Sequence, residues 1–228
     1  GLRSYMLGVY NHMTIALLFS GLFAFGTKML TTVTGPDGGL YLTSLGQLIY
    51  ASPLKWVIML APLGMVFWLS ARISHMSATK ARNLFYVYGA IMGLSLASIL
   101  LVYTGASVAR AFFITAGAFA GLSLYGYTTK RSLSAMGSFM VIGLFGLIIA
   151  MVVNIFLGST QLEFVISVGG VLIFAGLTAW DTQRIKSMYL AGDSREVAAK
   201  KSIFGALTLY LDFINMFLFI LRLFGNRE

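Results

Sequence analysis

The sequence contains no cysteine and little charge, and both absences restrict what the protein can be. Without cysteine there is no disulfide framework, no thiolate metal site and no cysteine nucleophile. Charged residues make up only 10% of the 228 positions, whereas soluble proteins average about 25%. Hydrophobic residues make up 58% and the mean hydropathy is +0.87, which is more apolar surface than a soluble domain of this length can bury. The composition therefore predicts an integral membrane protein.

Seven apolar runs are long enough to cross a bilayer, for which a helix needs about 20 residues. We expect an all-α membrane protein with one transmembrane domain over residues 1–228. The predicted spans are 10–30, 54–71, 84–104, 109–128, 135–157, 164–180 and 202–224. Polar loops are expected at 34–39, 72–83 and 190–201, and the third and fourth spans should form an antiparallel hairpin. Small residues at helix-contact spacing predict close packing at Gly89, Gly93, Gly117 and Gly121.

Basic residues are distributed unevenly between the two ends of the spans. With a cytoplasmic N-terminus, eleven of the sixteen Lys and Arg residues face inward. The five that face outward are Lys28, Lys55, Arg110, Arg222 and Arg227. The positive-inside rule therefore favours a cytoplasmic N-terminus. The net charge of +9 is explained by basic loops facing anionic lipid, and no nucleic-acid partner is expected.

The C-terminal segment allows two topologies. Seven full spans leave the C-terminus outside, whereas a re-entrant last segment would return Arg222 and Arg227 to the inside. The sequence does not decide between these arrangements. It also does not fix the oligomeric state, and a monomer in the lipid bilayer is compatible with it.

Two aspartates stand in apolar surroundings. Asp181 lies at the end of the sixth run, and Asp212 lies inside the last run. A carboxylate at the centre of a membrane helix costs about 2.5–3.5 kcal/mol on insertion scales, so such a residue indicates a functional site. The polar residues that share a helical face with one or the other aspartate are Thr178, Arg184, Thr208 and Asn215.

The last two runs are consecutive, so their helices should be antiparallel neighbours that bring Asp181 and Asp212 together. Two carboxylates in contact at low dielectric do not both ionise easily, so such a pair can share a proton. Its oxygen atoms also suit a hard cation such as Ca²⁺. Two simpler interpretations stay open. Asp181 can form a local ion pair with Arg184, and Asp212 can be satisfied by a nearby Thr or Asn.

Enzyme classes with similar residues fit less well. Intramembrane aspartyl proteases also use two membrane aspartates, one as base and one as acid, and usually show Tyr-Asp and Gly-x-Gly-Asp. This chain has Trp-Asp and Leu-Asp at the two positions. No GxSG motif accompanies the only histidines, His12 and His75, and no GxxxxGKS motif for ATP binding occurs. We therefore assign no catalytic residue and expect no cofactor.

Three segments together resemble the transmembrane Bax inhibitor motif family, specifically its bacterial members. They are "FAGLTAWDTQRI" at 174–185, "LYLDFINMFLFILR" at 209–222 and "LSARISHMS" at 69–77. The similarity covers nearly the whole chain. It implies seven membrane helices, the last enclosed by two layers of three, in the bacterial inner membrane.

The resemblance also implies a function, a pH-sensitive calcium leak channel. In it, Asp181 and Asp212 form the pH-sensing and Ca²⁺-binding dyad, and Arg72 latches onto Asp181 when the path is closed. Arg222 matches an outer-side arginine, but no acid to pair with it is evident at the end of the first span or the start of the second. Some bacterial relatives resemble modulators of a membrane-anchored AAA protease, so a non-catalytic regulator is the alternative.

Overall fold

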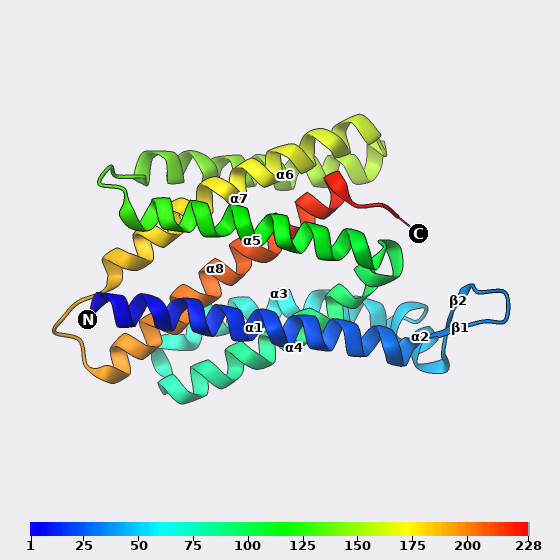
Figure 1. The fold of residues 1–228 in the computed structure, drawn as a ribbon, viewed down its shortest axis with the longest axis horizontal. Helices are drawn as coiled ribbons and strands as arrows, with labels where there is room; N and C mark the ends of the chain where they lie inside the picture. Colours follow the sequence, from blue (N-terminus) through cyan, green and yellow to red (C-terminus); the bar gives the residue numbers. More distant parts are fainter. Residues whose placement is uncertain (228) are drawn as a thin grey trace.

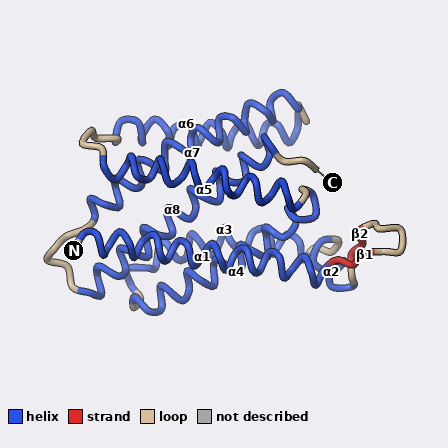
Figure 2. Tube along the Cα trace, viewed as in Figure 1, coloured by secondary structure: helices blue, strands red, loops and turns tan. Residues whose placement is uncertain are grey.

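The computed structural model describes residues 1–227, and helices account for most of them (Figures 1 and 2). The elements are α1 (Leu2–Thr31), β1 (Thr32–Thr34), β2 (Leu40–Leu42), α2 (Ser44–Tyr50), α3 (Leu54–Arg72), the 3₁₀ turn η1 (Ile73–His75), α4 (Ala78–Val102), α5 (Gly105–Thr128), α6 (Ser134–Leu157), α7 (Thr160–Met188) and α8 (Arg195–Phe224). Within residues 1–227, seven helices are long and apolar enough to cross a membrane. The prediction of an all-α membrane protein with seven spans is confirmed.

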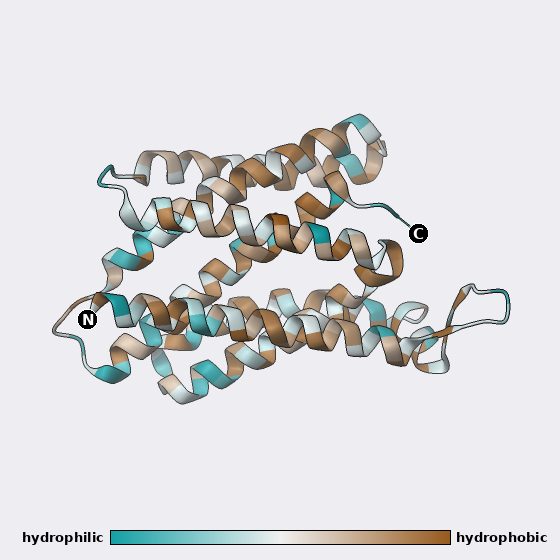
Figure 3. Cartoon of the chain, in the orientation of Figure 1, coloured by the Kyte–Doolittle hydropathy of each residue, from teal (hydrophilic) through white to brown (hydrophobic). Residues whose placement is uncertain are grey.

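Apolar side chains on the outer faces of the helices suit a lipid environment. Figure 3 shows apolar positions along the helices and polar ones mostly near the helix ends and in the loops. On α6, large apolar side chains are exposed at Phe139, Ile142, Phe145, Ile149 and Phe156. In contact with lipid, exposure of this kind needs no further partner.

Several helices continue beyond the predicted spans. α1 begins at Leu2, α4 begins at Ala78, α7 ends at Met188 and α8 begins at Arg195. The expected loops are therefore wrong for residues 78–83 and 195–201. Hydropathy detects only the membrane-embedded part of a helix, and a helix continues into water where its end is capped. The Ser194 side chain caps α8 by accepting a hydrogen bond from the Val197 N–H at 3.2 Å.

The connection between α1 and α3 is more ordered than the expected loop at 34–39. β1 and β2 form an antiparallel hairpin with Thr32 opposite Leu42, and α2 follows it. Asp37 at the turn accepts hydrogen bonds from the Tyr41 hydroxyl at 2.7 Å and from the Gly39 N–H at 3.0 Å. These bonds hold the pKa of the exposed Asp37 carboxyl below its ordinary value, and the bond from Tyr41 contributes most to the shift.

α8 forms the centre of the molecule. In the most apolar 18-residue stretch of α8, 72% of the residues are buried, against 6% in the corresponding stretch of α6. α8 packs against α1 and α4 on one side and α5 and α7 on the other, crossing obliquely between them (Figure 1). It is one unbroken helix of 30 residues, about 45 Å long at 1.5 Å per residue. This continuity favours a full crossing over a re-entrant segment, and the two termini lie at opposite ends of the bundle.

Two of the predicted close contacts are confirmed and two are wrong. A methyl group added at Gly89 or Gly93 of α4 would collide with the backbone oxygen of Ala16 or Ser20 of α1. These glycines therefore permit the close packing of α1 against α4. A methyl group at Gly117 or Gly121 of α5 would meet nothing within 4 Å, so those glycines make no helix contact.

The expected hairpin of the third and fourth spans is also wrong. α4 packs on α1 and α3, whereas α5 packs on α7 and α8, and α4 and α5 share few contacts. The connection between α4 and α5 instead pairs with the C-terminal segment, where the Thr104 N–H donates to the Asn226 carbonyl at 3.0 Å. The chain therefore crosses from one side of α8 to the other at this point.

Candidate functional site

The packing of α7 against α8 brings the two aspartates together. Asp181 is 4% exposed and Asp212 is 5% exposed. Both residues line the same cavity between the helices. This placement follows from the antiparallel arrangement of two consecutive helices joined by a short turn at residues 189–194.

Both carboxyl groups line one cavity of about 660 Å³, which we call the dyad cavity. Residues of α3, α6, α7 and α8 form its walls, and most of them are apolar. Its charged and polar lining residues are Ser70, Asp181, Arg184, Thr208, Asp212 and Asn215. The two aspartates and Arg184 are therefore the charged groups that face each other across this space.

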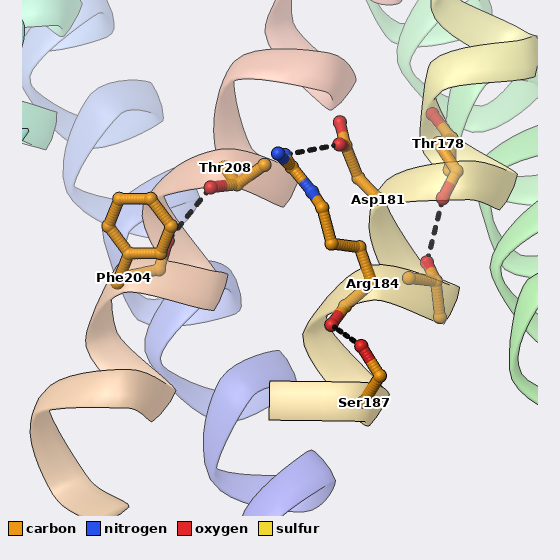
Figure 4. A network of polar contacts seen from close by, with 7 residues as sticks. Thr178, Asp181, Arg184, Ser187, Phe204 and Thr208 are labelled. Atoms are coloured by element: carbon orange, nitrogen blue, oxygen red, sulfur yellow. Dashed lines mark hydrogen bonds and ion pairs between the residues drawn. The ribbon is translucent and has the colours of Figure 1, made fainter. Parts of the chain in front are cut away.

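The arginine on Asp181 is Arg184. Its Nη2 lies 2.7 Å from Asp181 Oδ1, and its guanidinium lies 4.6 Å from the centroid of the Trp180 ring. Figure 4 shows Arg184 reaching back along α7 to Asp181, with its guanidinium directed toward Thr208 of α8. The Arg184 side chain is 46% exposed and that of Asp181 only 6%. A partly solvated cation thus covers a buried carboxylate.

Arg72, the expected latch, lies elsewhere in this structure. It is the last residue of α3, is exposed, and makes no ion pair with any residue from 1 to 227. Its helix nevertheless borders the dyad cavity, because Ser70 is among the lining residues. The local ion pair that the sequence left open is the one observed.

Asp212 lacks a hydrogen-bond donor. Its Oδ2 is buried and has no partner within residues 1–227. The expected neighbours donate to their own helix instead, Thr208 to the Phe204 carbonyl at 3.0 Å and Asn215 to the Leu211 carbonyl at 2.8 Å. A buried carboxylate oxygen beside a second carboxylate is satisfied by a proton held between the two groups or by a cation.

Thr178 has a structural role here. It is fully buried, donates to the Phe174 carbonyl at 2.7 Å and is not among the residues lining the dyad cavity. Among the expected dyad neighbours, Thr208 and Asn215 are therefore the ones that face the cavity.

The oxygen atoms that line the dyad cavity suit weak binding of a hard cation. Two carboxylates, the Asn215 amide oxygen and the Thr208 hydroxyl line the space, whereas Ca²⁺ takes six to eight oxygen ligands. No cluster of three or more His, Cys, Asp or Glu side chains that could hold a metal occurs in the described part of the chain. Water would have to complete the coordination of any ion at this site.

Arg222 lines a second cavity of about 590 Å³ toward the C-terminal end of α8. Its guanidinium lies 5.5 Å from the centroid of the Phe219 ring. Glu163 of α7 lines the same cavity, but its ion pair, at 3.7 Å, is with Arg227, and Arg222 makes no ion pair within residues 1–227. The position of Glu163 just before the sixth predicted span is the sequence signal that could have identified it.

The sequence matches a known protein family over almost its whole length. The family model described as "Inhibitor of apoptosis-promoting Bax1" matches residues 2–228. The chain is 43% identical to the inner membrane protein YbhL of Escherichia coli, over all of this chain and 94% of YbhL. It is 46% identical to the protein RP147 of Rickettsia prowazekii, over all of this chain and 92% of that protein.

Proposed function

Because the chain belongs to the Bax inhibitor family, and because two buried carboxyl groups meet in one of its cavities, we propose that it is a pH-sensitive calcium leak channel of the bacterial inner membrane. The observation that carries the proposal is the unpartnered Asp212 oxygen in a cavity that Asp181 also lines. The inner-membrane assignment rests on similarity to YbhL, and a cytoplasmic N-terminus rests on the distribution of Lys and Arg.

The three charged groups of the dyad cavity supply the gating chemistry. In the closed state Arg184 holds Asp181 and partly neutralises the pair. A proton taken up by the pair removes the negative charge that holds the guanidinium, and Ca²⁺ competes with the guanidinium for the same oxygens. Either event shifts the equilibrium toward a state in which Arg184 turns out of the cavity mouth.

Arg72 is assigned the second latch. It ends the helix whose Ser70 borders the dyad cavity, but it lies about 200° around that helix from Ser70, so a rotation of the end of α3 is needed to bring its guanidinium to the cavity mouth. Two arginines on different helices would then take turns as the ion-pair partner of Asp181. Arg184 belongs to the same helix as Asp181, whereas Arg72 would bring the end of α3 against the two aspartates.

Arg222 is assigned the outer gate. The dyad cavity and the outer cavity share Met151 of α6, and Phe219 lines the dyad cavity beneath the Arg222 guanidinium. An ion passing between the two cavities must therefore displace these side chains. Glu163 offers a carboxylate that attracts a cation into the outer cavity.

The test is calcium flux into liposomes that contain the purified protein and a calcium-sensitive dye, measured over a series of pH values. We expect the flux through the unaltered protein to rise as pH falls, because protonation of the dyad releases Arg184. Asp212→Asn should abolish this pH dependence. The matched control is Asp193→Asn, which alters an acid that pairs with Lys201 outside the dyad cavity.

Either of two results would overturn the proposal. An Asp212→Asn protein that conducts Ca²⁺ with an unchanged pH profile would remove the dyad from the mechanism. Absence of Ca²⁺ flux at every pH in protein that is folded in the liposomes would remove the channel function itself.

A further inference from the structure

A second set of cavities lies between α1 and α5, which share few contacts with each other. In Figure 1 the two helices run along the bundle with α8 crossing between them. Three cavities of about 670, 460 and 450 Å³ follow one another along this seam. Adjacent cavities share the lining residues Met13, Thr14, Leu17, Gly21, Phe112, Phe119 and Phe213. They therefore adjoin one another in a row, which we call the α1/α5 cleft.

Most of the α1/α5 cleft is apolar. Its middle and outer sections contain no charged lining residue, and Phe213 and Phe217 of α8 contribute to their walls. A methyl group added at Gly21 of α1 would meet nothing within 4 Å. The groove is thus open beside apolar side chains, at a depth where a membrane protein meets acyl chains.

The end of the cleft near the N-terminus is positively charged. Arg3 lines this section, is exposed, and has no ion-pair partner in the part of the chain that the structure describes. Tyr127 lines it from α5, and the Lys186 ammonium lies 4.7 Å from the Tyr127 ring centroid while donating to the Tyr127 carbonyl. No Asp or Glu lines any section of the cleft. One end therefore attracts an anion and the rest attracts hydrocarbon.

We propose that the α1/α5 cleft binds one anionic phospholipid. Its phosphate lies at Arg3, with the Lys186 ammonium held nearby on the Tyr127 carbonyl, and one acyl chain runs along Thr14 and Phe119 toward Phe213. From Arg3 to Leu17 is fourteen residues of α1, about 21 Å at 1.5 Å per residue. That length covers one leaflet, about half of the ~30 Å hydrocarbon core. Cationic residues at one end of an apolar slot fit this amphiphile better than an uncharged lipid.

Native mass spectrometry of the full chain released from mixed-lipid nanodiscs tests the proposal. The probes are phosphatidylglycerol and phosphatidylcholine with identical acyl chains, which differ in headgroup charge. We expect one retained phosphatidylglycerol per chain. Arg3→Gln should lower the retention of phosphatidylglycerol relative to phosphatidylcholine about fivefold, the effect of one basic residue near a membrane surface. Arg131→Gln, which alters an exposed arginine outside the cleft, should leave the ratio unchanged.

A second pair of variants tests the acyl-chain path. Ala120 lines the cleft, whereas Ala118 on the same helix is also exposed and lines none of the three sections. Ala120→Leu should lower the retention of both lipids, and Ala118→Leu should lower neither. Because both changes are alanine to leucine on one helix, a general effect on folding would affect them alike.

Three outcomes would overturn the proposal. Equal retention of the two lipids by the unaltered protein would exclude headgroup recognition. Equal effects of the two leucine variants would place the retained lipid outside the cleft. A dimer in the same spectra that Ala120→Leu converts to monomer would show that a second copy of the chain fills the cleft instead.

Discussion

The dyad cavity and the α1/α5 cleft lie on different faces of the same helix, and they differ in the chemistry that α8 offers. Thr208, Asp212 and Asn215 recur at intervals of four and three residues and face the dyad cavity. Phe213 and Phe217 are four residues apart and face the cleft. Because 3.6 residues make one helical turn, a shift of one position turns a side chain by about 100°. One central helix can thus present an ion-binding face and a lipid-binding face.

The largest expected effect comes from placing an acid on the wrong face of α8. Phe213 is 3% exposed and packs its ring 5.5 Å from both Phe112 and Phe119. Phe213→Asp loses this packing, about 3–5 kcal/mol for a buried phenylalanine, and adds an unpaired charge among apolar residues. We expect the free energy of unfolding to fall by at least that amount, measured by denaturation in lipid micelles.

The neighbouring position supplies the control for this change. Asp212→Asn removes a charge whose Oδ2 is unpartnered, so the protein should keep its stability or gain slightly. Similar losses of stability for Phe213→Asp and Asp212→Asn would mean that the two faces of α8 are not chemically distinct.

The effect on the calcium leak at neutral pH depends on which arginine closes the dyad cavity. Arg184→Gln removes the ion pair with Asp181. A partly exposed pair contributes up to about 1 kcal/mol, so the calcium leak at neutral pH should rise up to about fivefold. Arg72→Gln should raise the calcium leak only if Arg72 also forms an ion pair with Asp181. A larger rise for Arg72→Gln than for Arg184→Gln would show that the observed ion pair is not the main latch.

An effect on stability smaller than that of Phe213→Asp distinguishes the packed α1/α4 contact from the open surface of α5. Gly89→Ala places a methyl group 2.8 Å from the Ala16 carbonyl oxygen, and overpacking of this kind destabilises by about 1–3 kcal/mol. Gly117→Ala meets nothing within 4 Å and should be neutral or stabilise by up to about 1 kcal/mol through helix propensity. Thermal unfolding in the same detergent compares them, and equal shifts in Tm would contradict the packing difference.

The limits of sequence reasoning follow from what each signal reports. Apolar run length reports membrane burial, so it located the seven spans but placed the start of α8 at residue 202 rather than at Arg195. Glycine spacing permits close packing without requiring it, which is why Gly89 has a partner helix and Gly117 does not. Chain order and helix direction were enough to predict that Asp181 and Asp212 approach each other.

The choice of partner for Asp181 could not be predicted in the same way. Arg184 is near it on any α-helix, whereas Arg72 approaches only if α3 has a particular tilt and ends at a particular depth. The pairing of Glu163 with Arg227 likewise depends on how the C-terminal segment returns beside the connection between α4 and α5. The tilt of a helix and the depth at which it ends are set by the packing of all seven helices together. A local sequence pattern therefore does not predict them.

The smallest expected effect uses an acid outside the membrane to isolate the dyad. The hydrogen bond from Tyr41 lowers the pKa of the Asp37 carboxyl, so the unfolded chain takes up a proton at higher pH than the folded hairpin does. The stabilisation of the hairpin is therefore complete above the ordinary carboxyl pKa of about 4, and it is lost only as pH falls through the lower folded value. Asp37 stays ionised near neutral pH, so Asp37→Asn should leave the pH profile of calcium flux unchanged. If Asp37→Asn shifts that profile as much as Asp212→Asn does, the pH response cannot be attributed to the carboxyl pair on α7 and α8.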